Sequence, residues 1–211
     1  MMKSPPQIIA LKGYSNSGKT SSLESIVKFL KREGKKTAII KNIHQENFSI
    51  DQPGKDTWKM RHAGGDPIVS YSKDEIAFLT NKKLDVNQTI QLLQKIREDL
   101  DYIFLEGFWK NKYPKILFFK DLDELERIIL HVFDHPLRKE ILLSTFCLSG
   151  LYSLKCNKHD LLEKFATLCK QKPIDMELKI HLETLPMINI KKEPDKLLKL
   201  YNSSTLVYEN L

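Results

Sequence analysis

Short apolar runs alternate with amphipathic stretches in the first part of the chain. Residues 7–11 form a short, mainly apolar run, which predicts a buried strand. Apolar residues then recur at helical spacing, at Leu23, Ile26, Val27 and Leu30. Gly34 is typical of a helix end, and the apolar run at 37–43 predicts a second strand.

The same alternation continues further along the chain. Residues 67–71 predict a third strand, and Asn87 is placed to cap a helix that ends at Leu100. Later apolar runs predict strands at 101–105, 116–119, 128–133 and 142–148. A helix-like stretch follows from 160 to about 170.

Strands that alternate with helices in this way predict an α/β fold. We expect three layers around a mainly parallel central sheet, within one domain at 1–170. Residues 171–211 are expected to form a small C-terminal extension. In it, 178–182 and 185–189 predict a hairpin, and 195–201 predict a short helix.

The composition excludes several classes of protein. Of the 211 residues 41% are apolar, and no apolar run approaches the roughly 20 residues of a membrane-spanning helix. Residues 1–6 show no export signal, so we expect a cytoplasmic protein with no membrane partner. Cys147, Cys156 and Cys169 lack metal-type spacing and are expected to stay reduced. The net charge of +7 comes from scattered lysines, which favours a solvated surface over a nucleic-acid partner.

One motif carries most of the chemical information. Residues 13–20 read Gly-Tyr-Ser-Asn-Ser-Gly-Lys-Thr, a complete G-x-x-x-x-G-K-[ST] phosphate-binding loop. Such a loop aims backbone N–H groups at phosphates, the lysine reaches the β- and γ-phosphates, and the hydroxyl coordinates Mg²⁺. The predicted nucleotide-binding residues here are Gly13, Tyr14, Ser15, Asn16, Ser17, Gly18, Lys19, Thr20 and Ser21. Chance also produces this pattern, but a predicted strand before it and helix after it favour a P-loop fold.

A P-loop protein also needs an acidic group at the end of another central strand. Glu106 follows the apolar run at 101–105 and precedes Gly107, so it should emerge beside the phosphate loop. We expect Thr20 and Glu106 to hold the metal, and Lys19, Glu106 and Asp51 to act in catalysis. The alternative is that Glu106 is an ordinary strand-end carboxylate.

Residues 45–65 predict a long polar loop, and loops of this length are usually functional or mobile. Asp51 or Asp56 could bind metal through water, while Lys55 and Arg61 could offset charge on phosphoryl oxygens. A charged surface loop would have the same composition, so both interpretations stay open.

Four segments, of which the phosphate loop is the first, occur here in a specific order. The phosphate loop is followed by Ile-Asp-Gln-Pro-Gly-Lys-Asp-Thr-Trp at 50–58, by Arg-His-Ala-Gly-Gly at 61–65, and by Leu-Glu-Gly-Phe at 105–108. This order resembles the MobB family, the molybdopterin-guanine dinucleotide biosynthesis protein B group. The likeness covers roughly the first 120 residues.

The resemblance implies a GTP-binding adapter with slow, Mg²⁺-dependent GTP hydrolysis. It would act beside the MobA-type guanylyltransferase that joins GMP to molybdopterin, and we expect a homodimer. Carried over by position, the phosphate and Mg²⁺ residues would be Gly13, Ser17, Gly18, Lys19 and Thr20. Glu106 would lie at the metal side, and the family loop would comprise Asp51, Lys55, Asp56 and Arg61. The family often has several histidines before this loop, whereas this chain has only His44 there, which leaves a metal role for His44 in doubt.

Guanine specificity in many GTPases depends on an N-K-x-D string after a late strand. Residues 157–160, Asn-Lys-His-Asp, match that string, but Asn157 or Asp160 capping a following helix explains the same letters. Tyr14 stands where some dimer-switched ATPases carry an extra lysine, so the chain is not of that type.

Three other functions fit a P-loop. A metallochaperone-like GTPase would show a metal site rich in histidine or cysteine, which is absent from the sequence. A small-molecule kinase usually has an arginine-rich lid, whereas Arg97, Arg127 and Arg138 are dispersed along the chain. An adapter that holds nucleotide without turnover differs from a slow GTPase only in rate.

Overall fold

The computed structural model describes residues 4–108, most of 111–128, the strand at 145–150, and positions 188, 193, 195 and 196. The chain divides into two compact units. Met1–Asn42 and Asp99–Leu211 belong to the first unit, and Ile43–Glu98 forms the second. Within the described residues, we find no helix with the length and apolar character that a membrane crossing requires.

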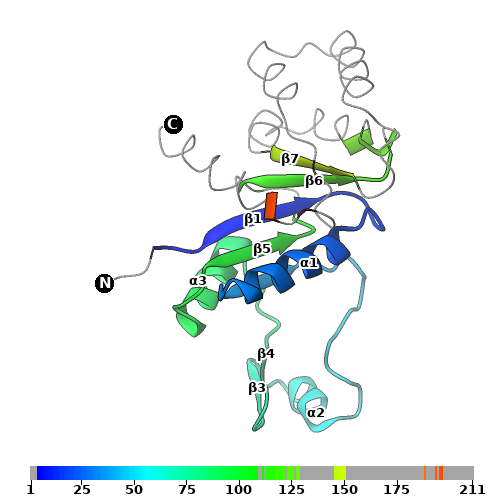
Figure 1. Cartoon of the computed structure of the whole chain (residues 1–211). Helices are drawn as coiled ribbons and strands as arrows, with labels where there is room; N and C mark the ends of the chain where they lie inside the picture. The colour runs from blue at the N-terminus through cyan, green and yellow to red at the C-terminus, as the bar shows by residue number, and fades with distance from the viewer. Residues whose placement is uncertain are drawn as a thin grey trace. The chain divides into compact units, whose positions relative to one another are not determined.

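A five-stranded parallel sheet forms the centre of the first unit (Figure 1). Its strands are β1 (Gln7–Lys12), β2 (Thr37–Lys41), β5 (Tyr102–Glu106), β6 (Lys115–Phe119) and β7 (Thr145–Gly150). They lie in the order β2-β5-β1-β6-β7, and every neighbouring pair is parallel. All five strands therefore point their carboxyl ends toward the same edge, and the predicted α/β fold with a mainly parallel sheet is confirmed.

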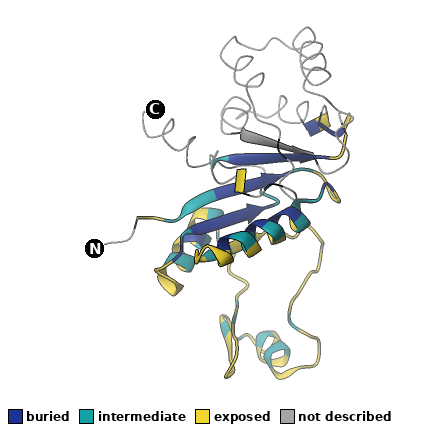
Figure 2. Ribbon diagram, viewed as in Figure 1, coloured by how far each residue is buried: buried dark blue, intermediate teal, exposed yellow. Residues whose placement is uncertain are grey.

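Helix α1 (Lys19–Arg32) packs against one face of this sheet. The shared core contains Leu23, Ile26 and Leu30 from the helix and Ile9, Leu11, Phe104, Ile116 and Phe118 from the strands. The strand positions alternate because successive side chains in a strand point to opposite faces. Figure 2 shows β5 and β6 buried along their whole length, as parallel strands covered on both faces are.

The second unit is built from a short helix, a hairpin and a longer helix. These elements are α2 (Asp56–His62), β3 (Ile68–Tyr71), β4 (Ile76–Leu79) and α3 (Val86–Ile96). The third predicted strand is present as β3, but it pairs antiparallel with β4 and is not part of the central sheet. The sequence did not predict β4.

Two predictions for the second unit are wrong in detail. Residues 45–65 are not loop throughout, because they contain α2, whose seven residues are too few to show a helical period. The cap of α3 is Asp85 instead of Asn87, and the helix ends before Leu100. Asp85 takes this role because its carboxylate accepts from the Gln88 amide while the Gln88 side chain accepts from the Asp85 amide.

The strand predicted at 128–133 is also wrong at its first residue. Ile128 is helical, and so are residues 123–125 and Arg127. Asp121 starts this turn, since its side chain accepts from the Glu124 amide at 2.7 Å. Leu125 and Ile128 are both buried, so their spacing of three belongs to a helix face.

Several predictions lie outside the described residues. They are the remainder of that strand at 129–133, the helix at 160–170, most of the C-terminal extension at 171–211, and Cys156 and Cys169. Within the extension, Ile188 is buried in the core beside α1, and residues 195–196 are helical.

Two buried lysines lie next to each other in the centre of the sheet. Lys12 and Lys115 are almost fully buried, and they share one face because Lys115 pairs with Ala10, two residues before Lys12. Burial, together with the smaller effect of the nearby Lys115 charge, lowers the pKa of Lys12 from 10.5 to about 6. Burial also lowers the pKa of Lys115 to about 7, while its ammonium donates to the carbonyls of Asn111 and Tyr113.

The low pKa of Lys12 predicts a stability that rises with pH. Between about pH 6 and pH 10.5 the unfolded chain keeps the Lys12 proton and the folded chain has released it, so raising the pH favours folding. Lys12→Met should remove up to about 1.4 kcal/mol of this dependence per pH unit. Urea unfolding between pH 7 and 9 measures it, with the exposed Lys28→Met as control. Equal slopes in all three proteins would contradict the assignment.

Gly13 lies where the end of β1 passes very close to β6. Its φ is +148°, and a Cβ built there would lie 2.5 Å from the main-chain oxygen of Phe118. Gly34 offers a matched comparison, because its φ is +73° but no atom lies within 4 Å of the same position. Both glycines have left-handed backbones, but only Gly13 faces a steric clash.

Gly13→Ala should therefore destabilise the fold more than Gly34→Ala. We expect about 1 kcal/mol for Gly34→Ala, and about 1–3 kcal/mol beyond that for Gly13→Ala, because a main-chain oxygen cannot rotate away. Free energies of unfolding in urea give both values. If the two variants lose the same stability, the close approach of the loop to β6 is wrong.

Candidate functional site

The phosphate loop connects β1 to α1 at the carboxyl edge of the sheet. Gly13, Asn16 and Gly18 have positive φ values of 148°, 61° and 83°, which fold residues 13–18 into a compact turn. Ser17 is fully buried within this turn, and its amide donates to the Tyr14 carbonyl. The sequence thus places two glycines and an asparagine where left-handed backbone is needed.

The start of α1 is favourable for an anion. Gly18 is the N-cap and offers no side chain to the first helical amides, and the first turn contains no acidic residue. The first amides of a helix lack intrahelical acceptors, and the helix dipole adds partial positive charge there. With the turn of residues 13–18 directly before it, this end of α1 can receive a phosphate group.

Lys19 folds back over the loop. Its ammonium donates to the Tyr14 carbonyl and lies 3.3 Å from the Ser17 hydroxyl. Burial lowers the pKa of Lys19, and the nearby carboxylates of Glu106 and Glu124 raise it in opposition. Both partners of the ammonium are uncharged, so an incoming phosphate would replace them with a stronger, charge-assisted contact.

Thr20 and Glu106 meet at the end of β5. The Thr20 hydroxyl donates to Glu106 Oε1 at 2.9 Å, and the Lys41 ammonium lies 3.5 Å from the same oxygen. Glu106 is 7% exposed, so its charge is held close to these two groups. A hydroxyl and a carboxylate beside a phosphate loop are oxygen ligands of the kind that Mg²⁺ prefers, and the residues therefore fit this ion.

The four loop residues Asp51, Lys55, Asp56 and Arg61 lie in the second unit, whereas the phosphate loop and Glu106 lie in the first. Their roles toward nucleotide stay predictions. Lys55 is the N-cap of α2, and Asp56 is an exposed partner of Lys59 at 3.7 Å.

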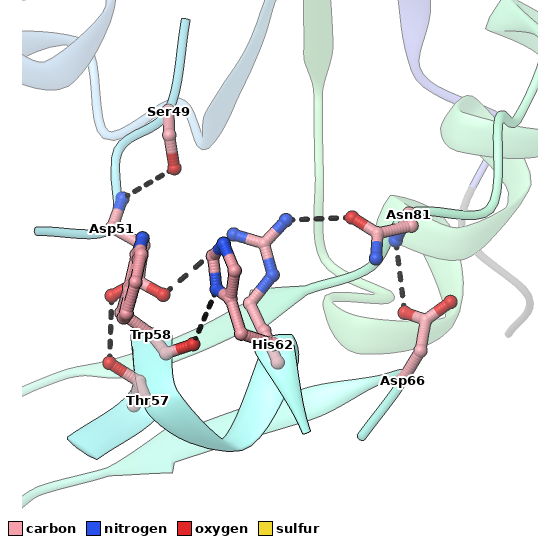
Figure 3. A network of polar contacts seen from close by, with 8 residues as sticks. Ser49, Asp51, Thr57, Trp58, His62, Asp66 and Asn81 are labelled. Carbon is pink, nitrogen blue, oxygen red and sulfur yellow. Dashed lines mark hydrogen bonds and ion pairs between the residues drawn. The ribbon is translucent and has the colours of Figure 1, made fainter. Parts of the chain in front are cut away.

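Asp51 is the centre of a polar network in the second unit (Figure 3). Its side chain is 4% exposed, accepts from the Thr57 hydroxyl at 2.7 Å, and lies 3.7 Å from the Arg61 guanidinium. Arg61 also donates to the Asn81 side chain at 2.7 Å, and the main-chain amide of Asn81 donates to the Asp66 carboxylate at 2.9 Å. Asp51 and Arg61 thus connect α2 to the segment that precedes it and, through Asn81, to the segment that follows the hairpin.

His62 and Trp58 stack on the same helix, with ring centroids 3.7 Å apart. The His62 Nδ1 lies 2.8 Å from the Trp58 carbonyl (Figure 3). His44 is exposed. Among the residues that the structure describes, no three histidine, cysteine or acidic side chains gather into a metal-binding group.

Sequence reasoning missed several charged residues around the phosphate loop. Lys41, Lys120 and Glu124 are close enough to influence the charge of Lys19. The Arg127 guanidinium lies over the Tyr14 ring, with its central carbon 5.6 Å from the ring centroid. The sequence does contain a usable signal, because Lys41 is the last residue of β2 and Lys120 directly follows β6.

Residues 8–132 match a family model described as molybdopterin guanine dinucleotide synthesis protein B. A molybdopterin-guanine dinucleotide biosynthesis adapter protein from Haemophilus influenzae is 31% identical over 130 residues, 59% of this chain and 72% of that protein. One from Escherichia coli is 29% identical over 116 residues, 54% of this chain and 66% of that protein.

A crystal structure of Bacillus subtilis MobB covers 80% of this chain and 99% of its own, with a TM-score of 0.58. At 20% identity this likeness concerns the fold. The family model covers more than half of the chain, including the phosphate loop and Glu106. The resemblance predicted from the sequence is confirmed, and the chain belongs to the molybdopterin guanine dinucleotide synthesis protein B (MobB) family.

Proposed function

We propose that this chain is a GTP-binding adapter in the biosynthesis of the molybdopterin-guanine dinucleotide cofactor. The observation that supports this most directly is the position of Glu106. Its carboxylate lies at the carboxyl end of β5, hydrogen-bonded to Thr20 at the end of the phosphate loop. Family membership supplies the biosynthetic context. We place the protein in the cytoplasm.

The triphosphate is bound by the loop and the start of α1. Main-chain amides of residues 13–18 surround the phosphates, and Lys19 moves from the Tyr14 carbonyl to the β- and γ-phosphates. Thr20 and Glu106 hold Mg²⁺, which neutralises charge on the phosphate oxygens when it is bound. Lys41 then exchanges its contact with Glu106 for one with the nucleotide.

Guanine is recognised by the segment after β7. This strand lies two places from β1 in the sheet and runs parallel to it. The chain therefore leaves β7 at the edge that carries the phosphate loop, and the Asn-Lys-His-Asp string at 157–160 begins seven residues after Gly150. Residues 157–160 lie outside the described part, so this step depends on the sequence and on strand order.

Hydrolysis, in this proposal, is slow and depends on Mg²⁺. With nucleotide bound, the Glu106 carboxylate would hold Mg²⁺ together with Thr20, and Asp51 is held by Thr57 and Arg61. A carboxylate with such partners is a weak base for an attacking water. The protein therefore acts mainly through the GTP-bound state, presented to a MobA-type guanylyltransferase and its molybdopterin substrate.

The hairpin of the second unit offers a surface for homodimerisation. Val69 lies opposite Phe78, and Tyr71 lies opposite Ile76, so the four side chains share one hairpin face. Their exposed fractions are 48%, 60%, 80% and 49%. An isolated two-stranded hairpin is marginally stable in water, and we propose that this face packs on a second copy of the chain.

Nucleotide binding gives the first test. Calorimetry with Mg²⁺ should show that GTP binds about tenfold or more tightly than ATP. Lys19→Ala should lose about 10- to 100-fold in affinity, because a charge-assisted phosphate contact is removed. Lys28→Ala removes a charge from an exposed position of the same helix and should change nothing. No heat with any triphosphate would contradict the proposal.

Two further variants test the Mg²⁺ site and the preference for guanine separately. Glu106→Gln should abolish the gain in GTP affinity that Mg²⁺ brings, while binding without Mg²⁺ persists. Asp160→Ala should reduce the preference for GTP over ATP if it pairs with guanine. If Asp160 is only a helix cap, the preference stays and the melting temperature falls.

Sedimentation velocity tests the dimer. The wild-type protein should sediment as a dimer at micromolar concentration, and the double variant Tyr71→Thr, Phe78→Thr as a monomer. Threonine keeps the strand propensity but removes the apolar surface. Ser70→Thr, on the opposite hairpin face, serves as control. A monomeric wild type, or a double variant that remains dimeric, would overturn this part.

A further inference from the structure

Two cations converge on Tyr14, the second residue of the phosphate loop. The Lys19 ammonium donates to its main-chain carbonyl, and the Arg127 guanidinium lies over its ring at 5.6 Å. Tyr14 is 38% exposed and Arg127 is exposed, so the contact lies at the surface of the loop. Nothing in the motif requires an arginine at this place.

Arg127 is fixed in position by the turn that carries it. Asp121 caps this turn directly after β6, and Leu125 and Ile128 anchor it in the core. The Arg127 Nε lies 3.4 Å from the Asp123 carbonyl, which directs the side chain along its own turn. The backbone of Arg127 is therefore held beside the loop, while the end of its long side chain can still change partner.

The charges near Lys19 are mixed before nucleotide binds, because Lys41 and Lys120 act on the same ammonium as two carboxylates. Two carboxylates, Glu106 and Glu124, act on Lys19, and Glu124 is nearly fully buried where it accepts from the Lys120 amide. A triphosphate adds several negative charges to this place. Arg127 can neutralise part of them, because a guanidinium forms paired contacts with phosphate oxygens.

We propose that Arg127 contacts the terminal phosphate of the bound nucleotide. This inference rests on the proposed function. Without nucleotide, the guanidinium rests on the Tyr14 ring, and with a triphosphate it exchanges that contact for phosphate oxygens. The exchange is favourable because an exposed cation–π contact is weaker than a paired guanidinium–phosphate contact. The γ-phosphate is the target, since Lys19, which also contacts Tyr14, binds the β- and γ-phosphates in such loops.

The proposal makes Arg127 a residue that distinguishes GTP from GDP. This role of Arg127 differs from a structural role, in which the arginine would only cover Tyr14 and support the loop. It also differs from a base contact, in which the guanidinium would stack on guanine and act equally on both nucleotides. Affinities for the two nucleotides separate these roles.

Calorimetry with Mg-GTP and Mg-GDP on the full chain is the test. Arg127→Ala should weaken GTP by about tenfold or more and GDP by less than about twofold. Arg127→Lys should recover part of the loss, because it restores the charge without the paired geometry. Arg97→Ala, in the second unit, is the charge control.

Each result either supports or overturns the contact of Arg127 with the terminal phosphate. Equal weakening of GTP and GDP by Arg127→Ala, or no weakening of either, overturns the inference. If Lys19→Ala abolishes binding while Arg127→Ala binds GTP normally, only this inference fails and the nucleotide site stands. If the wild-type chain binds neither nucleotide, both fail. Should Arg127→Ala lower the melting temperature, Arg127→Gln keeps most of the stem and gives the same comparison.

Discussion

The parallel pairing of β1 with β5 is the constraint on which the site depends. Leu11 lies opposite Glu106 in this pairing, so the chain enters the phosphate loop at the level of the Glu106 carboxylate. Thr20, at the start of α1, completes the arrangement with a 2.9 Å hydrogen bond. A slip of one residue would turn Glu106 to the other face of the sheet and separate it from Thr20.

The two units use their charged residues in different ways. In the first, Lys19, Glu106 and Arg127 hold partners that a nucleotide can replace, because each contact is exposed or involves a neutral group. In the second, Asp51 and Arg61 hold each other inside a network that connects α2 to the flanking segments. An adapter needs both properties, namely a site that changes with its ligand and a surface that keeps its shape.

Much of this could be predicted from the sequence, because the central strands and α1 have clear apolar patterns and the phosphate loop is one continuous segment. Glu106 was predicted from its place after an apolar strand. Arg127 was not, because the fold brings it to Tyr14 from more than 100 residues away. The prediction of the hairpin was incomplete for another reason. Its second strand, β4, has only four residues, and its outward side chains are apolar. Local patterns thus specify elements, whereas the neighbours of the loop depend on strand order.

Amide hydrogen exchange with and without Mg-GTP tests the central claim most directly. If main-chain amides hold the phosphates, nucleotide should slow exchange in the peptide that covers residues 13–22 far more than elsewhere, and Lys19→Ala should remove the effect. A chain that binds GTP while these amides exchange at an unchanged rate would contradict the account, because the nucleotide would then occupy another place.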